Sequence, residues 1–276
     1  MAGFLRPGTA QILRGGYCPE AQQFFARATN LTGSSKARYN QTIRALVMKG
    51  YWARMDLLQI WATDNQATAL LNLKNSSFAS TTSGTVSFSI HRGFTGNGSN
   101  FYLNSNFTPS GDGVNYLQDS KSMSVGILTN RVTNNTYRAC SANNAAGTGY
   151  DHIIPKWSDG AAYGALSTNT TNANAASSTA KGIWIACRTS SSQIDLYRNA
   201  DTAAFATNAA STSEGNPDRS ALFFAGYINA GGGISNWTAD EMAFGFLGAG
   251  FSAAEQSEIA QIINDLYLRP LNINIF

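Results

Sequence analysis

The sequence predicts a mainly β protein built as a two-sheet antiparallel sandwich, and three observations lead to this prediction. Hydrophobic residues make up 43% of the 276 residues and charged residues only 13%, while Gly, Asn, Ser and Thr are plentiful. The central part of the chain consists of short segments of alternating polarity separated by turn residues. Apolar residues at helical spacing are confined to segments near the two ends. A chain of this length can form one large all-β domain.

Residues 1–33 are expected to form an N-terminal attachment arm, and residues 34–276 the sandwich domain. The arm is irregular, apart from a short helix that begins at Pro19, where the fixed φ of proline suits the first turn. It holds too few apolar side chains for a core of its own, so we expect it to need a partner surface. Residues 1–60 contain eight Lys or Arg against two acidic residues, which favours an acidic partner. The alternative is that the arm caps the domain itself.

Two longer helices are expected at the two ends of the domain. A lead-in helix over residues 35–50 has apolar residues on one face and ends at Gly50. A closing helix starts at a capping box formed by Ser252 and Glu255, because the hydroxyl of the serine can accept the amide of the glutamate, whose carboxylate reaches back. The residues of this helix expected to face the core are Ile259, Ile262, Ile263 and Leu266.

Short apolar or alternating segments between these helices predict the strands of the sandwich. They cover residues 55–62, 69–74, 85–90, 101–106, 122–129, 136–142, 182–189, 194–199, 221–228 and 241–247. Two stretches rich in Ala, Ser, Thr and Asn, residues 160–180 and 201–219, are expected to be long loops.

The cysteines indicate the redox compartment, and the net charge limits the class of partner. Cys18, Cys140 and Cys187 cannot all pair within one chain, so we expect free thiols, which fits assembly in a reducing cytoplasm. Cys187 alternates with Ile183 and Ile185, which predicts that it is a core residue. A net charge of +3 is too small to indicate a nucleic-acid partner. No apolar run reaches the about 18 residues that a membrane span requires.

Several segments carry a family resemblance. They are 52–58 (WARMDLL), 71–75 (LNLKN), the glycine-studded turn 92–98 (RGFTGNG), 182–188 (GIWIACR) and 194–199 (IDLYRN). Together with the strand that leads into the capped closing helix, they resemble the concanavalin A-like (laminin-G-like) jelly-roll proteins encoded among bacteriophage and prophage structural genes. The likeness covers roughly residues 36–268, and Ala200 stands where the corner after the strand 194–199 has glycine in the family.

This resemblance implies a two-sheet jelly-roll sandwich and a virion component assembled in the host cytoplasm. The protein would be a capsid or tail decoration, fibre or spike that adheres to host-surface glycans or stabilises the particle. Its implied partners are other virion proteins, reached through the arm, and further copies of the chain in a homo-oligomer. The alternative is a carbohydrate-active enzyme or a secreted lectin on the same sandwich, because one fold serves many tasks.

No set of residues in the chain predicts catalysis. A glucanase on this fold needs two carboxylates on one strand face, but Asp240 and Glu241 are adjacent and so point to opposite faces. The G-x-S-x-G elbow of many serine hydrolases is missing. His91 and His152 are expected to be surface or cap residues, and without a C-x-x-C pair they form no familiar zinc site. We therefore expect no catalytic residues and no enzyme.

Calcium is the one cofactor for which the sequence offers candidates. Lectin-like sandwiches often bind calcium at a loop edge through carboxylate, amide and carbonyl oxygens. The aspartates in loop-like segments are Asp112, Asp119, Asp151 and Asp159. None belongs to a recognisable calcium loop, so no metal ligand is assigned, and unligated turn aspartates are the alternative.

Sugar binding would use exposed aromatic faces with Asn or Asp groups beside them to hold hydroxyls. Tyr150, Asp151, Trp157 and Tyr163 cluster in the sequence and are the candidate ligand-binding residues. The alternative for Trp157 and Tyr163 is that they cover the edge of the sandwich.

Overall fold

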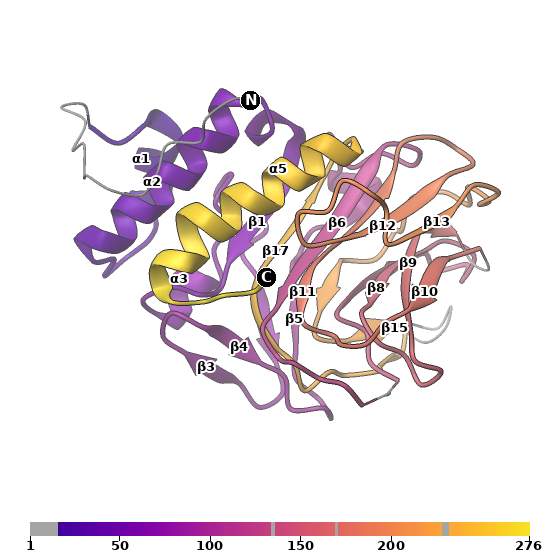
Figure 1. Ribbon diagram of the computed structural model, residues 1–276. Helices are drawn as coiled ribbons and strands as arrows, with labels where there is room; N and C mark the ends of the chain where they lie inside the picture. The colour runs from indigo at the N-terminus through magenta and orange to yellow at the C-terminus, as the bar shows by residue number, and fades with distance from the viewer. Residues whose placement is uncertain (1–15, 134–135, 169–170, 228–231) are drawn as a thin grey trace.

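The computed structural model describes residues 16–133, 136–168, 171–227 and 232–276, and it confirms the mainly β prediction. Two antiparallel sheets pack face to face as a sandwich, and helices lie against the outer face of one of them (Figure 1). The molecule is therefore built in three layers: helices, a first sheet and a second sheet. None of the helices in these described ranges is both long and apolar enough to cross a bilayer.

The first sheet is the central layer. Its strand order is β13 (Ala206–Asn208), β12 (Ile194–Arg198), β11 (Gly182–Arg188), β6 (Lys121–Ile127), β17 (Glu241–Gly248), β4 (Gly93–Thr95) and β3 (Ser87–Ser89), and β1 (Met55–Ile60) also pairs with β17. The register sets Gly182 opposite Ile127 and Arg188 opposite Lys121. Lys121, Arg188 and Gly248 thus lie at one end of the sheet, together with Met55.

The second sheet is the outer layer. Its order is β10 (Ala173–Ala176), β9 (Ala161–Thr168), β8 (Tyr150–Ile154), β7 (Cys140–Asn143), β14 (Leu222–Phe223), β5 (Tyr102–Asn104) and β2 (Thr81–Ser83). A small two-stranded ribbon, β15 (Gly226–Tyr227) with β16 (Ile234–Ser235), is separate from both sheets.

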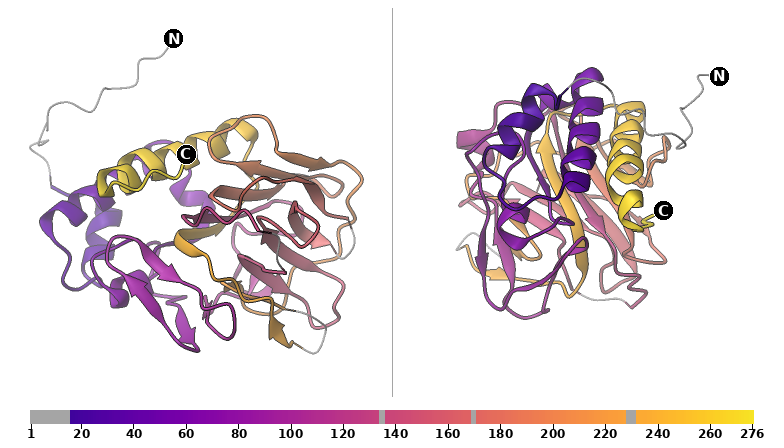
Figure 2. Two further views of the ribbon diagram at one scale, coloured as in Figure 1. Left: turned by 60° about the horizontal axis from the view of Figure 1, so that its bottom comes forward. Right: turned by 90° about the vertical axis from the view of Figure 1, so that its left-hand side faces the viewer.

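The helical layer follows the predicted signals. It contains α1 (Pro19–Phe25), α2 (Gly33–Met48) and α5 (Ala253–Ile263), and α2 and α5 lie side by side over the first sheet (Figure 2). Pro19 occupies the first turn of α1, and α2 ends before Gly50, whose φ is 76°. The capping box of Ser252 and Glu255 is present at the start of α5. A π-helical turn (Asn264–Leu268) and a 3₁₀ turn (Arg269–Leu271) continue this end of the chain.

The first sheet is buried on both faces, because its strands alternate between two cores. On β11, Ile183, Ile185 and Cys187 face the helices, while Trp184 and Ala186 belong to the core between the sheets. All three cysteines of the chain are free, and Cys187 is buried as the alternation predicted. β11 is therefore apolar from Ile183 to Cys187, since both of its faces are covered.

The described part of the predicted arm, residues 16–33, packs against the domain. Ala21 and Phe24 of α1 are fully buried, and the ring of Phe24 lies 4.8 Å from that of Tyr39 on α2. The ring of Tyr39 lies 4.8 Å in turn from that of Tyr267. Phe24 therefore finds its apolar partner within this chain. Residues 1–15 lie outside the described residues, and the attachment of the arm to a partner stays a prediction.

The structure corrects several predicted elements. Residues 69–74 form no strand, since a short helix, α3 (Gln66–Ala69), ends there. The stretches 160–180 and 201–219, predicted to be loops, contain β9, β10 and β13, and β8 was also missed. β9, β10 and β13 are rich in small residues, and β9 approaches the first sheet closely. A Cβ on Gly164 would meet Leu196 at 3.1 Å.

Two further predictions are right in part. The strand expected over residues 221–228 breaks at Phe224, whose positive φ of 71° separates β14 from β15. In the closing helix, Ile259 and Ile263 are buried and Ile262 packs partly buried against the core, as predicted. Leu266 is only partly buried and does not belong to this core.

The difference between Ile262 and Ile263 is testable. Ile263→Asp places an unpaired charge in the core between α5 and the first sheet, so we expect it to lower the free energy of unfolding by about 3 kcal/mol or more. Ile262→Asp, the matched control, can turn its carboxylate toward water and should cost less than half as much. Urea unfolding followed by circular dichroism measures both. Equal losses would contradict the placement of the closing helix.

Candidate functional site

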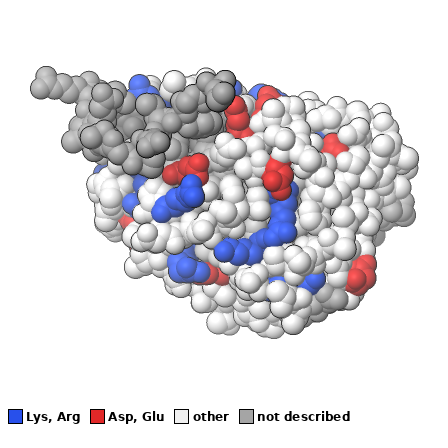
Figure 3. All heavy atoms as spheres, viewed as in Figure 1, with Lys and Arg blue, Asp and Glu red and all other residues white. Residues whose placement is uncertain are grey.

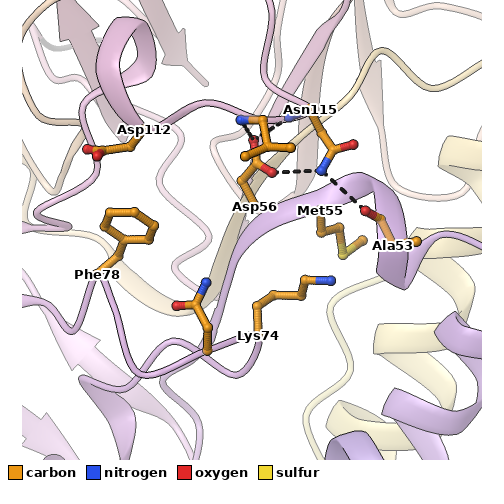
Figure 4. Close-up of a pocket in the computed structure, with 9 residues that line it drawn as sticks. Ala53, Met55, Asp56, Lys74, Phe78, Asp112 and Asn115 are labelled. Carbon is orange, nitrogen blue, oxygen red and sulfur yellow. Dashed lines mark hydrogen bonds between the residues drawn. The ribbon is translucent and has the colours of Figure 1, made fainter.

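A hollow of about 220 Å³ opens beside the start of β1, at the end of the first sheet that carries Lys121 and Arg188. Its walls come from three separate parts of the chain: the turn before β1, the segment that follows Leu73, and the loop around α4 (Pro109–Asp112) (Figure 4). The lining residues are Ala53, Met55, Asp56, Lys74, Asn75, Phe78, Asp112, Val114 and Asn115. We call it the β1 hollow.

Asp56 shapes one wall of the β1 hollow. Its Oδ2 accepts hydrogen bonds from the backbone amides of Val114, Asn115 and Tyr116 at 3.1, 2.8 and 2.9 Å. Its Oδ1 accepts one from Nδ2 of Asn115 at 2.7 Å. A carboxylate with four donors is fully engaged. Asp56 therefore fixes the loop of residues 113–116 and has little capacity left for a ligand.

Lys74 supplies a positive charge to the β1 hollow. Its ammonium lies 4.6 Å from the ring centroid of Trp52 and donates to the carbonyl of the same residue. No carboxylate lies within ion-pair distance of it among the described residues. Burial lowers the pKa of Lys74 to about 8, against the opposing charges of Asp56 and Glu20. The side chain is thus mostly protonated at neutral pH.

Phe78 brings an aromatic ring to the opposite side of the hollow, near Asp112 (Figure 4). Part of the ring packs edge-to-face on Phe107, with centroids 5.2 Å apart, and the residue is half-buried. Its φ of 61° lies in the left-handed region, which costs a non-glycine residue roughly 1–3 kcal/mol. Strained residues of this kind gather at ligand sites.

Three polar side chains that line the hollow keep hydrogen-bonding capacity. Oδ1 of Asn75 accepts from Asn72, while the Nδ2 group of Asn75 has no partner among the described residues. Oδ2 of Asp112 accepts from the amide of Thr108 at 2.7 Å, while Oδ1 is without a described partner. Asn115 uses only its Nδ2 group, so its Oδ1 is also available. The hollow therefore offers donors and acceptors around an apolar surface.

The structure places Tyr150, Asp151 and Tyr163 on the second sheet and Trp157 in the turn between two of its strands. Trp157 lies in the turn between β8 and β9, and its amide donates to the carbonyl of Ala161 at 2.7 Å. Tyr163 is opposite Ile154 near this turn, and its hydroxyl donates to Asp159. Tyr150 begins β8, four residues or roughly 13 Å from Ile154. Trp157 and Tyr163 thus lie at the same end of the β8–β9 hairpin, and Tyr150 lies at the other end of β8.

Asp151, the fourth of these residues, is fully buried between the sheets and is not a surface group. Its Oδ2 lies 2.9 Å from the ammonium of Lys121, which is also fully buried, and accepts from the hydroxyl of Tyr116 at 2.7 Å. Its Oδ1 accepts from the backbone amide of Ser167. Because these groups occupy the carboxylate, Asp151 cannot contact a ligand outside the protein in this conformation.

The aspartates considered for calcium lie in different places. Asp112 contacts the β1 hollow, Asp119 accepts from the hydroxyl of Ser213 at 2.6 Å, and Asp159 accepts from Tyr163. In the parts of the chain that the structure describes, no three His, Cys, Asp or Glu side chains gather as a metal site would require. Calcium binding stays untested.

The residues considered for catalysis also have separate partners. Asp240 pairs with Arg131 at 3.0 Å, and Glu241 pairs with Arg92, as their opposite strand faces predict. His91 contacts Asp64 at 2.6 Å. His152 was expected at the surface, but it lies buried on β8, where burial and the nearby charge of Arg138 hold its pKa well below the usual value.

Sequence reasoning missed the β1 hollow. Asp112 was considered as a calcium ligand, Asn75 and Asp56 lie in segments that resemble the family, and none of the three was assigned to a sugar site. The residues of the hollow come from segments separated by tens of positions in the sequence. Each segment alone has the composition of an ordinary turn, so no local pattern indicates that they converge.

Comparisons with known proteins support the fold. No family model matches the sequence, and no curated protein matches it. Among solved structures, the chain is similar to the binding domain of botulinum neurotoxin serotype D, with a TM-score of 0.51 and 12% identity over 76% of this chain and 52% of that one. It is also similar to a mutant of Trypanosoma rangeli sialidase displaying trans-sialidase activity, with a TM-score of 0.54 and 9% identity over 83% of this chain and 39% of that one.

The chain thus spans about half the length of the toxin domain and less of the sialidase. At such low identity the likeness shows a shared β-sandwich architecture. One of these structures is a binding domain and the other an enzyme, so the fold alone does not choose between the two activities.

The buried ion pair of Lys121 and Asp151 gives a prediction. Lys121→Met leaves a buried carboxylate without its counter-ion, so we expect the free energy of unfolding to fall by about 3–5 kcal/mol. Lys49→Met, the control, removes a partly exposed partner of Glu258 and should cost at most about 1 kcal/mol. Urea unfolding measures both. A loss for Lys121→Met as small as for the control would contradict the burial of this pair.

Proposed function

We propose that the chain is a non-catalytic glycan-binding module and that it serves as a bacteriophage virion structural protein, a capsid or tail decoration, fibre or spike that adheres to sugars of the host surface. The observation that carries the binding proposal is the β1 hollow, where the ring of Phe78 lies among polar groups with free hydrogen-bonding capacity.

The chemistry of the β1 hollow fits a sugar. One face of a pyranose ring is apolar and packs on an aromatic side chain, while its hydroxyls both donate and accept hydrogen bonds. Asn75 and Lys74 supply donors, and Asp112 and Asn115 supply acceptors. A volume of about 220 Å³ is below the roughly 300–1,000 Å³ of sites for drug-sized ligands, so the hollow fits one sugar residue of a longer chain.

The carboxylates of the β1 hollow favour binding over hydrolysis. The common glycosidase mechanisms need two carboxyl groups, one to protonate the leaving group and one to attack or to activate water. Asp112 keeps one free oxygen, but both oxygens of Asp56 are engaged by backbone and amide donors. This pair therefore lacks a second available carboxylate, and we assign no catalytic residue.

The virion role rests on the sequence resemblance and on the arm. A hollow for one sugar residue binds weakly, but many copies on one particle convert weak contacts into high avidity. The excess of basic residues in the first sixty positions supports attachment to an acidic partner surface in the particle. The carbohydrate-active enzyme or secreted lectin is the alternative on the same fold.

Substitutions at the two candidate sugar sites test the binding proposal. Against a panel of neutral oligosaccharides, Phe78→Ala should weaken binding about tenfold, since an aromatic contact contributes about 1–1.5 kcal/mol. Asn75→Ala changes an exposed side chain with little risk to folding and should also weaken binding. Trp157→Ala, the control on the second sheet, should leave it unchanged. Isothermal titration calorimetry measures all three.

Two outcomes would contradict this assignment. If Trp157→Ala abolished binding and Phe78→Ala did not, the site would be the one that the sequence predicted, at the β8–β9 turn. If the wild-type protein released sugars from the oligosaccharides and Asp112→Asn stopped the release without unfolding, the module would be an enzyme.

Removal of residues 1–15 tests the virion role. We expect the truncated chain to keep its strand-dominated circular dichroism spectrum, because α1 and the layers behind it stay intact, but to lose incorporation into particles. Co-sedimentation of truncated and full-length chains with assembled particles measures this. Equal incorporation of both chains would show that these residues are not the attachment segment.

A further inference from the structure

A second hollow, of about 240 Å³, lies at the opposite end of the first sheet from the β1 hollow. Its lining residues are Arg92, Leu128, Lys181, Asn272, Ile273 and Asn274. Leu128 follows β6 and Lys181 precedes β11, at the end of β17 that begins with Glu241. The β1 hollow lies by Gly248, seven residues or roughly 23 Å along the same strand. The two hollows are therefore separate, and we call this one the tail hollow.

The tail hollow is rich in positive charge. The ammonium of Lys181 has no carboxylate within ion-pair distance and no hydrogen-bond acceptor among the described residues. Arg92 is paired with Glu241 through Nε, at 2.8 Å, and through Nη2, which leaves its Nη1 group without a described partner. Figure 3 shows basic side chains gathered in the middle of this face of the molecule. The carboxylate of Glu241 thus pairs with Arg92, and the charge of Lys181 has no counter-ion at the tail hollow among the described residues.

The C-terminal tail adds amide groups in a fixed position. Ile273 and Ile275 are buried against the core under the helices. Asn272 and Asn274 alternate with them and therefore point outward. Asn272 and Asn274 are exposed and line the hollow, and their side chains have no hydrogen-bond partners in the described ranges. The amide of Ile273 donates to the carbonyl of Leu268 at 3.2 Å, which holds this segment in place.

We propose that the tail hollow binds an acidic saccharide, with its carboxylate or sulfate group at Lys181 and Arg92 and its hydroxyls at Asn272 and Asn274. This inference deepens the proposed glycan-binding function and rests on it. An oxyanion at this position pairs with an ammonium that has no other counter-ion, in charge-assisted hydrogen bonds that are about twice as strong as neutral ones.

The composition of the tail hollow favours a saccharide over a nucleic acid. Its apolar part consists of Leu128 and Ile273, so it has no aromatic platform on which a base can stack. Two cations at one small hollow are also fewer than the row of phosphate contacts that a nucleic-acid backbone needs. Amide side chains beside the cations match the hydroxyls of a sugar ring.

The two hollows differ in charge balance, which makes them separable in experiment. The lining of the β1 hollow contains one ammonium, that of Lys74, and two carboxylates, those of Asp56 and Asp112. In the tail hollow, Lys181 has no such counter-charge. Neutral sugars should therefore depend on Phe78, and acidic sugars should depend on Lys181.

The test compares a sulfated disaccharide and an oligogalacturonate with a neutral maltooligosaccharide, by isothermal titration calorimetry on the full chain. Lys181→Gln should weaken binding of at least one acidic saccharide about tenfold or more, since a hydrogen bond to a charged group is lost. Asn274→Asp, which adds a like charge at an exposed position, should weaken it as well. Lys49→Gln removes the same charge at the C-cap of α2, beside the turn into β1 at the other end of the first sheet, and should leave binding unchanged.

Each other outcome overturns the proposal. Binding of the acidic saccharides that is equal in wild type and Lys181→Gln would show that the tail hollow is not their site, and no binding at all would exclude this ligand class. Inorganic sulfate or phosphate bound as tightly as the saccharides would show a site for free anions only. If Phe78→Ala weakened the binding of neutral sugars while Lys181→Gln left the binding of acidic saccharides unchanged, the proposed function would stand and this inference would be wrong.

Discussion

The buried ion pair between Lys121 and Asp151 is the interaction on which much of the rest depends. Lys121 stands on β6 of the first sheet and Asp151 on β8 of the second, so the pair joins the two sheets through their common core. Neither charge is exposed, and each is costly to bury without the other. The hydroxyl of Tyr116 also donates to Asp151, which draws the loop of residues 113–119 against the sandwich. One wall of the β1 hollow is thereby set by an interaction inside the core.

Arg188 completes a polar region at the same end of the sandwich. It is fully buried, yet its nearest carboxylate, that of Asp119, lies 3.8 Å away on a partly exposed residue. Its guanidinium instead donates to the carbonyls of Leu166, Ser190, Ser191 and Thr212 and to the hydroxyl of Ser211. These bonds tie β11 to β9 and to the loop after β13. Burial of a second cation is therefore tolerated because carbonyl dipoles replace the counter-ion.

Sequence patterns found the elements whose signal is local. The capping box at Ser252 and the glycine after α2 mark helix ends because they act within a few residues. The strands rich in Ala, Gly and Ser, such as β9, were missed because close approach of the sheets selects small side chains there. In the sequence, Asp151 resembles a loop carboxylate. Its partner Lys121 is thirty positions away, so no local pattern predicts the ion pair. The β1 hollow was invisible for the same reason, because its walls meet only in the folded chain.

The layered construction also explains where ligands can reach the first sheet. The central strands of this sheet, β11, β6 and β17, are covered by the helices on one face and by the second sheet on the other. Both hollows lie at strand ends of this sheet, one by Met55 and one by Lys181. Different interactions hold the loops at the two ends. At the β1 hollow they are the buried ion pair of Lys121 and Asp151 and the hydrogen bonds to the carboxylate of Asp56. At the tail hollow, the buried side chains of Ile273 and Ile275 hold the C-terminal segment. Two hollows of different charge at opposite ends of one sheet follow from that arrangement.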